Sequence, residues 1–276
     1  MKPLSTAKVL RLVELRRGLA DQNMTLVDLS GKNLSQLNFQ GTILSEATLT
    51  GANLSNANLK GVDFTRADLK SVIFRLANLK EAVFTGANVR DTDFWGADLS
   101  RAVLTGIVNI LEARFDGASL ADANLSGLDL REARNLNQAR FERANLTQAI
   151  MEGIILENVS MNEANLNGAD LTKARLVHVK LGGADLQEAI FKDADMQMAY
   201  LNRCDAKNAD FSGANLTGAD MQDADLSGAK FVRTDLSSAN LRNANLTRAD
   251  MRGVNLGGAV LFGAKFVNVR GVVIKE

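Results

Sequence analysis

The stretch GANLSNANLKGVDFTRADLK, residues 51–70, consists of four pentapeptides with a large apolar residue at every fifth position. The large residues are Leu54, Leu59, Phe64 and Leu69, and a small apolar residue stands two places before each of them. Side chains two apart in an extended chain point to the same side, so the large and small residues face inward together and the Asn or Asp between them faces water. A five-residue period does not fit an α-helix, whose equivalent positions recur every 3.6 residues. Each pentapeptide is therefore predicted to form a very short strand.

The same pattern extends in both directions to give forty-eight units between Leu29 and Phe266. The register shifts by one residue near 105–109 and again near 131–135, and we expect bulged corners to absorb the two insertions. Eighteen of the 22 glycines stand two places after the large residue. Glycine adopts positive φ without a Cβ clash, so each unit is predicted to end in a tight corner with positive φ at this position.

The spacing of phenylalanines predicts the length of one coil. Phe191, Phe211 and Phe231 are 20 residues apart. Four pentapeptides per coil would place these rings above one another inside a four-sided tube. The backbone of such a tube must pair with the coils above and below it, as a parallel ladder. We therefore expect an all-β fold, a parallel β-helix (solenoid) of about twelve coils, roughly 55 to 60 Å long at the usual strand spacing.

Residues 51–70 and the stretch GANLTGADMQDADLSGAKF, residues 213–231, resemble the pentapeptide-repeat family, whose consensus is Ala-(Asp/Asn)-Leu-X-X. The resemblance covers about residues 27–268 and implies a right-handed quadrilateral β-helix. The hand follows from the resemblance alone. We divide the chain into an N-terminal capping helix and lead-in (1–25), the repeat β-helix (26–268) and a C-terminal cap or tail (269–276).

The N-terminal segment from Ser5 to Arg17 is predicted to be a helix that covers the first coil, because an open β-helix end exposes strand edges and core. Gly18 is the expected C-cap. Val9, Leu12, Val13 and Leu19 supply an apolar side. A second interpretation stays open, in which this basic helix binds an anionic membrane or a partner.

Composition excludes several classes of function. Thirty-two basic and 32 acidic residues cancel, so net charge favours neither the binding nor the mimicry of nucleic acid. A single cysteine excludes an internal disulfide. Apolar runs are too short to span a bilayer, and no secretory apolar segment precedes a cleavage site. We therefore expect a cytoplasmic protein that binds neither nucleic acid nor membrane.

The inventory of reactive side chains predicts no enzyme and no catalytic, cofactor or metal site. The single histidine, His178, occupies an outward corner position, whereas Cys204 replaces alanine in an inward one, so they are not expected to meet as base and nucleophile. A metal site of His and Cys ligands lacks its ligands. The aspartates recur because the repeat uses a short polar residue, as in Asp68, Asp98, Asp170, Asp185 and Asp220.

Apolar residues at outward positions are the candidate partner surface. These are Trp95, Ile150, Ile155, Ile190 and Tyr200. The isoleucines have an alternative explanation, because β-branched residues suit strands in any case. Tyr200 also belongs to a modest basic strip that acidic residues interrupt, which we interpret as solvated surface. The strip contains Arg140, Arg143, Lys180 and Arg203, and is interrupted by Glu142 and Glu163.

The C-terminal coil ends in apolar residues, and we take them as a candidate dimer surface: Val260, Phe262, Val267, Val272, Val273 and Ile274. Two like ends meeting about a two-fold axis would bury both patches. The resemblance supports this, because gyrase-binding family members dimerise through their C-terminal coils. In the competing interpretation, the last three of these residues fold back as a plug on a monomer.

The sequence thus predicts a non-enzymatic repeat rod that acts as a protein-interaction or scaffold module with an unidentified protein partner. The alternative is a DNA-mimicking regulator of a topoisomerase such as gyrase, the role that the best-known family members have. That role requires a strongly acidic surface, and the outward residues of the last twenty-seven units are close to neutral on every face.

Overall fold

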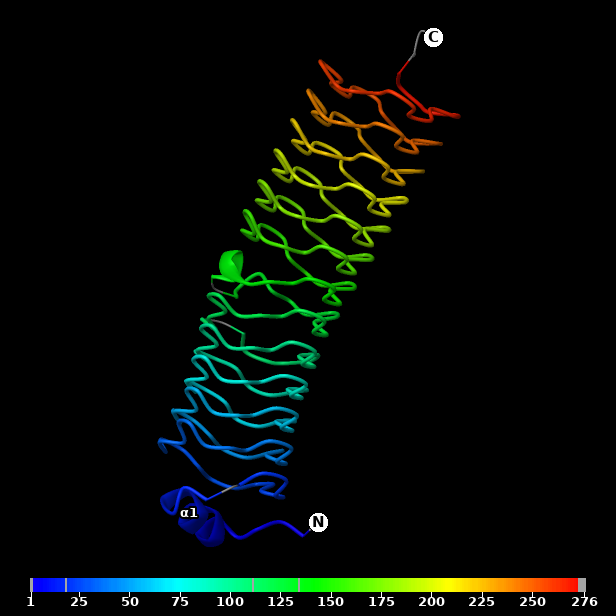
Figure 1. Cartoon of the computed structure of the whole chain (residues 1–276). Coiled ribbons are helices and arrows are strands. Elements are labelled where there is room, and N and C mark those ends of the chain that lie inside the picture. The colour runs from blue at the N-terminus through cyan, green and yellow to red at the C-terminus, as the bar shows by residue number, and fades with distance from the viewer. Residues whose placement is uncertain (1, 18, 111, 134, 273–276) are drawn as a thin grey trace. The chain divides into compact units, whose positions relative to one another are not determined.

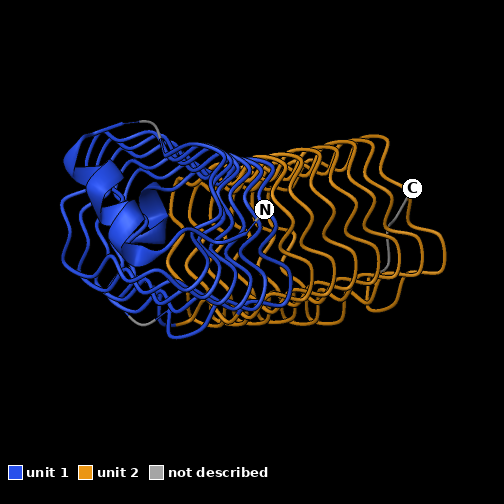
Figure 2. Cartoon of the chain, turned by 90° about the horizontal axis from the view of Figure 1, so that it is seen from below, with its two compact units in different colours: residues 1–128, 132–140 blue, residues 129–131, 141–276 orange. Residues whose placement is uncertain are grey.

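The computed structural model describes residues 2–17, 19–110, 112–133 and 135–272. It divides into two compact units, Met1–Leu128 with Glu132–Arg140, and Asp129–Arg131 with Phe141–Glu276, called unit 1 and unit 2 below (Figure 2). Within each unit the chain winds in stacked coils (Figure 1). The described residues contain two helices, α1 (Thr6–Glu14) and the short 3-10 helix η1 (Leu136–Gln138), and otherwise form single-residue parallel bridges joined by turns.

One coil takes 20 residues. Asn53 forms parallel bridges with Asn33 on the preceding coil and Ile73 on the next one. The Leu54 N–H donates to the Ile73 carbonyl at 2.8 Å, and equivalent bonds recur at every unit along this part of the chain. The bridges confirm the four-unit coil that the phenylalanine spacing predicts.

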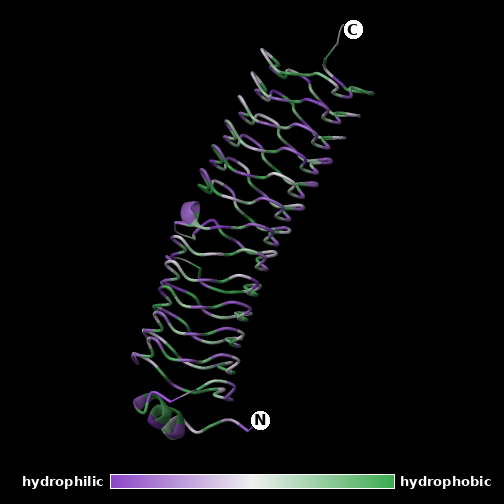
Figure 3. Ribbon diagram, viewed as in Figure 1, coloured by the Kyte–Doolittle hydropathy of each residue, from purple (hydrophilic) through white to green (hydrophobic). Residues whose placement is uncertain are grey.

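The core is made of columns of large side chains that stack from one coil to the next, with small side chains beside them. Phe211 is fully buried, and its ring stacks on Phe191 at 5.0 Å and on Phe231 at 5.2 Å between ring centroids. In unit 1, Phe64 stacks on Phe84 at 5.2 Å in the same way. Hydrophobic and hydrophilic residues alternate along the coils (Figure 3). The predicted inward positions and phenylalanine columns are confirmed.

The corners are four-residue turns closed by a backbone hydrogen bond from the fourth residue to the first, as from the Ala52 N–H to the Leu49 carbonyl at 2.8 Å. All eighteen glycines predicted at the third position have φ between 62° and 75°. Non-glycine residues also adopt this left-handed conformation there, as Asn56 does with φ 56°. The corner geometry therefore belongs to the fold, and glycine is its least strained occupant.

Asparagine and aspartate stabilise the corners from outside. Asp28 Oδ1 accepts hydrogen bonds from the Ser30 hydroxyl at 2.6 Å and the Ser30 N–H at 2.9 Å, and these bonds lower the pKa of Asp28. Amides also bond from coil to coil, from Asn78 Nδ2 to Asn58 Oδ1 at 3.1 Å and from Asn58 Nδ2 to Asn38 Oδ1 at 3.0 Å. A short side chain with an acceptor two residues before a backbone N–H is what this turn requires.

The two insertions lie within the extended part of a unit and not at a corner, which corrects the expectation of bulged corners. Asn109 and Asn135 both have φ 56°, and each directly precedes an inward residue, Ile110 or Leu136. Asparagine tolerates the left-handed conformation, so one residue can be extruded while the inward residues keep their side. Bridges that span an insertion join residues 21 apart. Arg134, which is within the range of the second insertion, lies outside the described residues.

Helix α1 lies across the end of unit 1 where the coils begin (Figures 1 and 2). Ser5 caps its start by accepting from the Lys8 N–H at 3.4 Å, and Val9 on its inner side is fully buried. The helix ends at Glu14 and not at Arg17 as predicted. The reason is a Schellman turn, in which Arg16 takes the left-handed conformation (φ 47°) that glycine usually supplies. Gly18, the predicted C-cap, lies outside the described residues.

Candidate functional site

Trp95 stands at a corner of unit 1, directly after the buried Phe94, and 43% of its surface is exposed. Its backbone N–H donates to Asp93 Oδ1 at 3.0 Å, and its backbone carbonyl accepts from the Leu76 N–H at 3.0 Å. Leu76, on the preceding coil, is 53% exposed. The sequence analysis missed Leu76, although leucine at a corner position normally held by glycine or a polar residue is a signal that could have found it.

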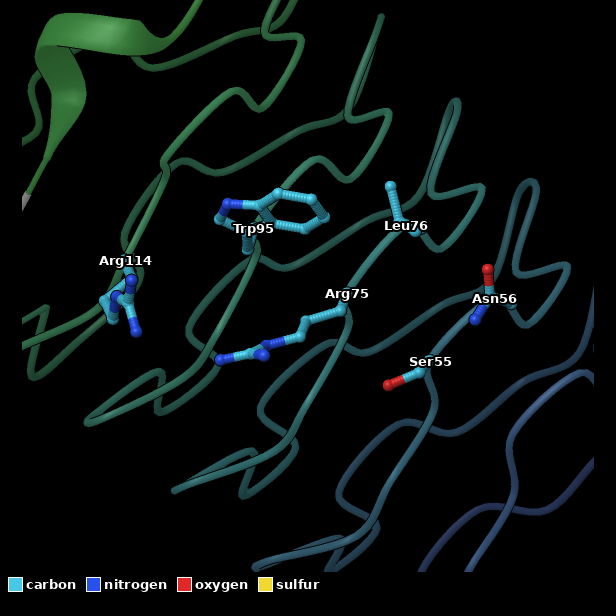
Figure 4. A pocket seen from close by; sticks show the side chains of 6 residues that line it. All are labelled: Ser55, Asn56, Arg75, Leu76, Trp95 and Arg114. Atoms are coloured by element: carbon cyan, nitrogen blue, oxygen red, sulfur yellow. The ribbon is translucent and has the colours of Figure 1, made fainter.

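A hollow of about 400 Å³ opens beside Trp95. Figure 4 shows the residues that line it, which come from successive coils of unit 1: Ser55, Asn56, Arg75, Leu76, Trp95 and Arg114. Leu76 lies over Gly96, because a Cβ at that glycine would come within 2.8 Å of Leu76 Cδ2. Gly96 also has φ 62°. Both the close approach of Leu76 and the positive φ favour glycine at this position, and the absence of a side chain there leaves room for Leu76 beside the indole.

Two aspartates beneath the surface orient the two arginines of the hollow. Arg75 Nε donates to Asp93 Oδ2 at 2.5 Å, and Arg114 Nε donates to Asp116 Oδ2 at 3.3 Å. The arginine side chains are 52% and 44% exposed, whereas both aspartate side chains are 13% exposed. Asp116 also accepts from Asn135 Nδ2 at 3.2 Å. The surface of the hollow therefore exposes two guanidinium groups to water, and the carboxylates that pair with them lie beneath.

The other residues of the candidate partner surface lie in unit 2, and the structure does not gather them into one patch. Ile150 and Ile190 share one face, where Asp170 lies between them. Ile155 lies on the next face of the coil, and Tyr200 lies on the face after that, bridged to Lys180. Ile150, Ile155 and Tyr200 are exposed, and Ile190 is half-buried. The sequence analysis treated these residues as one surface, but in the structure they are separate apolar side chains on three faces of the coils.

The last described coil of unit 2 differs from the coils before it. Its inward residues, such as Leu256, Leu261 and Phe266, are half-buried, whereas the equivalent residues of earlier coils are buried. Within the described part of the chain, the backbone N–H groups of these three residues have no hydrogen-bond partner. Phe262 projects outward with 72% of its surface exposed, and the Arg242 guanidinium lies 5.1 Å from its ring centroid.

The outward apolar surface continues from Phe262 to neighbouring residues of the same coil. Val260 and Val267 are exposed, and Val272 is half-buried. The remaining predicted members of the dimer surface, Val273 and Ile274, lie outside the described residues. Four of the six residues thus have a described position at the C-terminal edge of unit 2.

Cys204 and His178 do not form a reactive pair in an accessible site. Cys204 is buried in an inward position, and burial raises the pKa of its thiol to about 12. His178 is a half-buried corner residue with φ 56°. Among the described residues, no group of three or more His, Cys, Asp or Glu side chains could hold a metal ion. No helix in the described ranges is long and apolar enough to cross a bilayer.

The five recurring aspartates named from the sequence all perform the corner function that Asp28 illustrates. Each accepts a hydrogen bond from the N–H two residues further on, at 2.9–3.2 Å. They are Asp68, Asp98, Asp170, Asp185 and Asp220. The backbone thus explains their recurrence without any catalytic role.

A coil of pentapeptides with inward leucine and phenylalanine and outward asparagine and aspartate defines a pentapeptide-repeat β-helix. Family models agree: "Pentapeptide repeats" matches residues 23–61, 33–70, 77–107, 108–134, 194–231 and 229–268, and "Pentapeptide repeat region" matches 134–211. The chain belongs to the pentapeptide-repeat family. A comparison with curated proteins found no match.

Several solved structures are similar to the chain. HetL, a pentapeptide repeat protein involved in heterocyst differentiation regulation in the cyanobacterium Nostoc sp. strain PCC 7120, is 26% identical over 96% of this chain and 95% of its own, with a TM-score of 0.37. Rfr23 from the cyanobacterium Cyanothece 51142 is 23% identical over 46% of this chain and 91% of its own (TM-score 0.31). QnrB1, a plasmid-mediated fluoroquinolone resistance protein, is 20% identical over 73% of this chain and 90% of its own (TM-score 0.26).

Proposed function

We propose that the chain is a non-enzymatic interaction module, a cytoplasmic repeat scaffold whose outward side chains bind a protein partner. Side chains fill the inside of the coils, so the outer surface is what remains for recognition. The observation that carries the proposal is the exposed Trp95 beside the exposed Leu76 at a corner of unit 1, at positions where most units of the repeat have small or polar residues. Exposed aromatic residues of this kind are typical anchors of protein interfaces. The proposal includes a right-handed β-helix, as the family resemblance implies, and about twelve coils, as the number of units implies.

Affinity capture tests this function. The intact chain, a Trp95→Ala variant and an Asn215→Ser control are used as baits in lysate of the cells that make the protein. We expect a partner that the intact chain and the control retain equally and that Trp95→Ala loses. A bait that retains no partner above an empty matrix would contradict the proposal. Retention unchanged by Trp95→Ala would move the contact to the exposed Ile155 or Tyr200 of unit 2.

Regulation of a topoisomerase by DNA mimicry is the alternative function. Its requirement is a dense acidic surface, and the balance of 32 acidic and 32 basic residues does not meet it. The experiment that separates the two is a supercoiling assay with purified gyrase. We expect no inhibition at micromolar concentrations of the protein, and potent inhibition would favour the alternative over the interaction module.

We also propose that two copies assemble through the C-terminal coil. The half-buried inward residues of that coil, with N–H groups that have no partner among the described residues, form an edge that a two-fold partner would cover, together with Val260, Phe262 and Val267. Light scattering across a dilution series tests this, with a dimer of twice 29.7 kDa expected. Phe262→Asp should shift the mass to a monomer. A concentration-independent mass of one chain would instead support the fold-back plug, which stays open because Val273 and Ile274 lie outside the described residues.

A further inference from the structure

The hollow beside Trp95 combines an apolar platform with two oriented cations. Trp95 and Leu76 provide the platform, and about half of each side chain is exposed to water. A ligand that covers apolar surface of this kind gains affinity because it removes that surface from water. The platform is therefore suited to one aliphatic or aromatic side chain of a bound molecule.

The arginines add a requirement for negative charge. Each uses its Nε–H on the aspartate beneath it, Arg75 on Asp93 and Arg114 on Asp116. A guanidinium has five N–H donors, so the Nη groups of both arginines are left for a ligand. Holding the guanidinium planes in place before binding reduces the conformational entropy that a ligand must overcome. Paired N–H donors in a plane match a carboxylate.

The spacing of the two arginines sets the length of the ligand. Bridges join Ile73 to Asp93 and Asp93 to Arg114, so Arg75 and Arg114 come from coils two apart, with the Trp95 coil between them. Arg75 Nε bonds Asp93, so its guanidinium lies at the Trp95 coil, whereas Arg114 Nε bonds Asp116 on its own coil. The two guanidinium groups are therefore one coil spacing apart, about 4.8 Å, which is close to the roughly 6.6 Å between side chains two apart on the same side of an extended peptide. Figure 4 shows the Arg75 side chain running toward Arg114 past Trp95.

We propose that this hollow binds an extended acidic peptide segment of the partner, with carboxylates two residues apart on Arg75 and Arg114 and an apolar side chain two residues before or after this pair on Trp95 and Leu76. The inference rests on the proposed interaction function and names its ligand chemistry. A peptide fits better than a nucleic acid strand, because the aspartates beneath the arginines oppose a backbone that is charged at every nucleotide. The platform also pairs the indole with an aliphatic side chain and not with a second aromatic ring.

Trp95 is the only tryptophan of the chain, so its fluorescence reports occupation of the hollow directly. The probes are the peptides acetyl-Leu-Ser-Glu-Ser-Glu-Ser-Leu-amide and acetyl-Leu-Ser-Gln-Ser-Gln-Ser-Leu-amide and the oligonucleotide dT10, each titrated into the intact protein. We expect a saturable change in Trp95 emission with the acidic peptide, at least about tenfold weaker binding of the glutamine peptide, and weakening of the acidic complex by salt.

Arginine variants test whether Arg75 and Arg114 bind the acidic peptide. Arg75→Gln and Arg114→Gln should each weaken binding of the acidic peptide about tenfold. Arg66→Gln is the matched control: Arg66 is an exposed corner arginine of the same unit, two pentapeptides before Leu76 in the chain, and pairs with Glu46 at 3.0 Å. Leu76→Ser should also weaken binding, and because Leu76 is exposed it should leave the circular dichroism spectrum unchanged.

Several results would overturn the proposal: no saturable change with the acidic peptide, tighter binding of dT10 than of the peptide, or equal losses for Arg66→Gln and Arg75→Gln. Loss of peptide binding together with Trp95-dependent capture of a cellular partner would refute the peptide chemistry and leave the interaction function standing. Peptide binding without any captured partner would support the hollow as a peptide site and count against the interaction function alone.

Discussion

Replacing Phe211 by alanine tests whether stacked coils hold unit 2 together. The ring has no exposed surface and lies between Phe191 at 5.0 Å and Phe231 at 5.2 Å, with interplanar angles of 4° and 5°. Phe→Ala substitutions in cores cost about 3–5 kcal/mol. We expect a value toward the upper end, because backbone bonds to the neighbouring coils limit collapse around the cavity and two stacked ring contacts are lost together.

Urea unfolding followed by circular dichroism measures this cost. With an m-value of about 2 kcal/mol/M, the midpoint should fall by about 1.5–2.5 M. Phe211→Leu keeps most of the volume and the commonest inward residue of the repeat, so it should be milder. Asn215→Ser, at an outward position of the following unit, is the surface control. If Phe211→Ala were as mild as this control, the inference that stacked inward columns stabilise the coils would be wrong.

Four further predictions concern the inward positions and the corners. Ala214→Leu should overpack a small inward slot and destabilise the protein by about 1–3 kcal/mol, measured by urea unfolding. Native Cys204, buried with a pKa of about 12 against 9.0 for the free thiol, should resist thiol reagents until the protein unfolds, and rapid labelling of the native state would place it outside the core. Because the unfolded thiol ionises first, stability relative to Cys204→Ala should be constant below pH 9 and fall as the pH rises from 9 toward 12. The Ser30 bonds lower the pKa of Asp28, so the charge of Asp28 should stabilise the intact protein above about pH 4 and lose that effect on further acidification. The difference in unfolding midpoint between the intact chain and Asp28→Asn, whose amide oxygen keeps the turn acceptor, should therefore shrink below pH 4, and a difference that does not change with pH would contradict this.

The period of the sequence predicts the regular part of the fold because each position has one physical task. Leu54 must be inward, Asn53 outward and Gly51 at a corner for the backbone to pair at all. The burial of Cys204 follows from the same rule. These positions repeat so often that a single sequence carries the information that an isolated strand would lack.

Irregular features escaped prediction because local hydrogen bonds decide them. Helix α1 ends early since Arg16 adopts the left-handed conformation, which no residue type at that position requires. The extruded Asn109 lies between two positions that the period treats as adjacent. The hollow beside Trp95 depends on side chains from four coils, and only the coil length makes Arg75 and Arg114 its neighbours. The sequence singled out the tryptophan but not the residues around it.

Two different periods govern this fold. Whether a side chain faces inward or outward repeats every five residues, whereas its neighbours on the adjacent coils are twenty residues away. Deleting one pentapeptide from unit 2, such as residues 186–190, would leave every later side chain inward or outward as before. Each later side chain would nevertheless move one face round the coil, and Tyr200, now bridged to Lys180, would come opposite Arg175, which at present pairs with Asp195. Gain or loss of a single unit is thus a route by which such a chain can redistribute its surface residues while its core pattern is preserved.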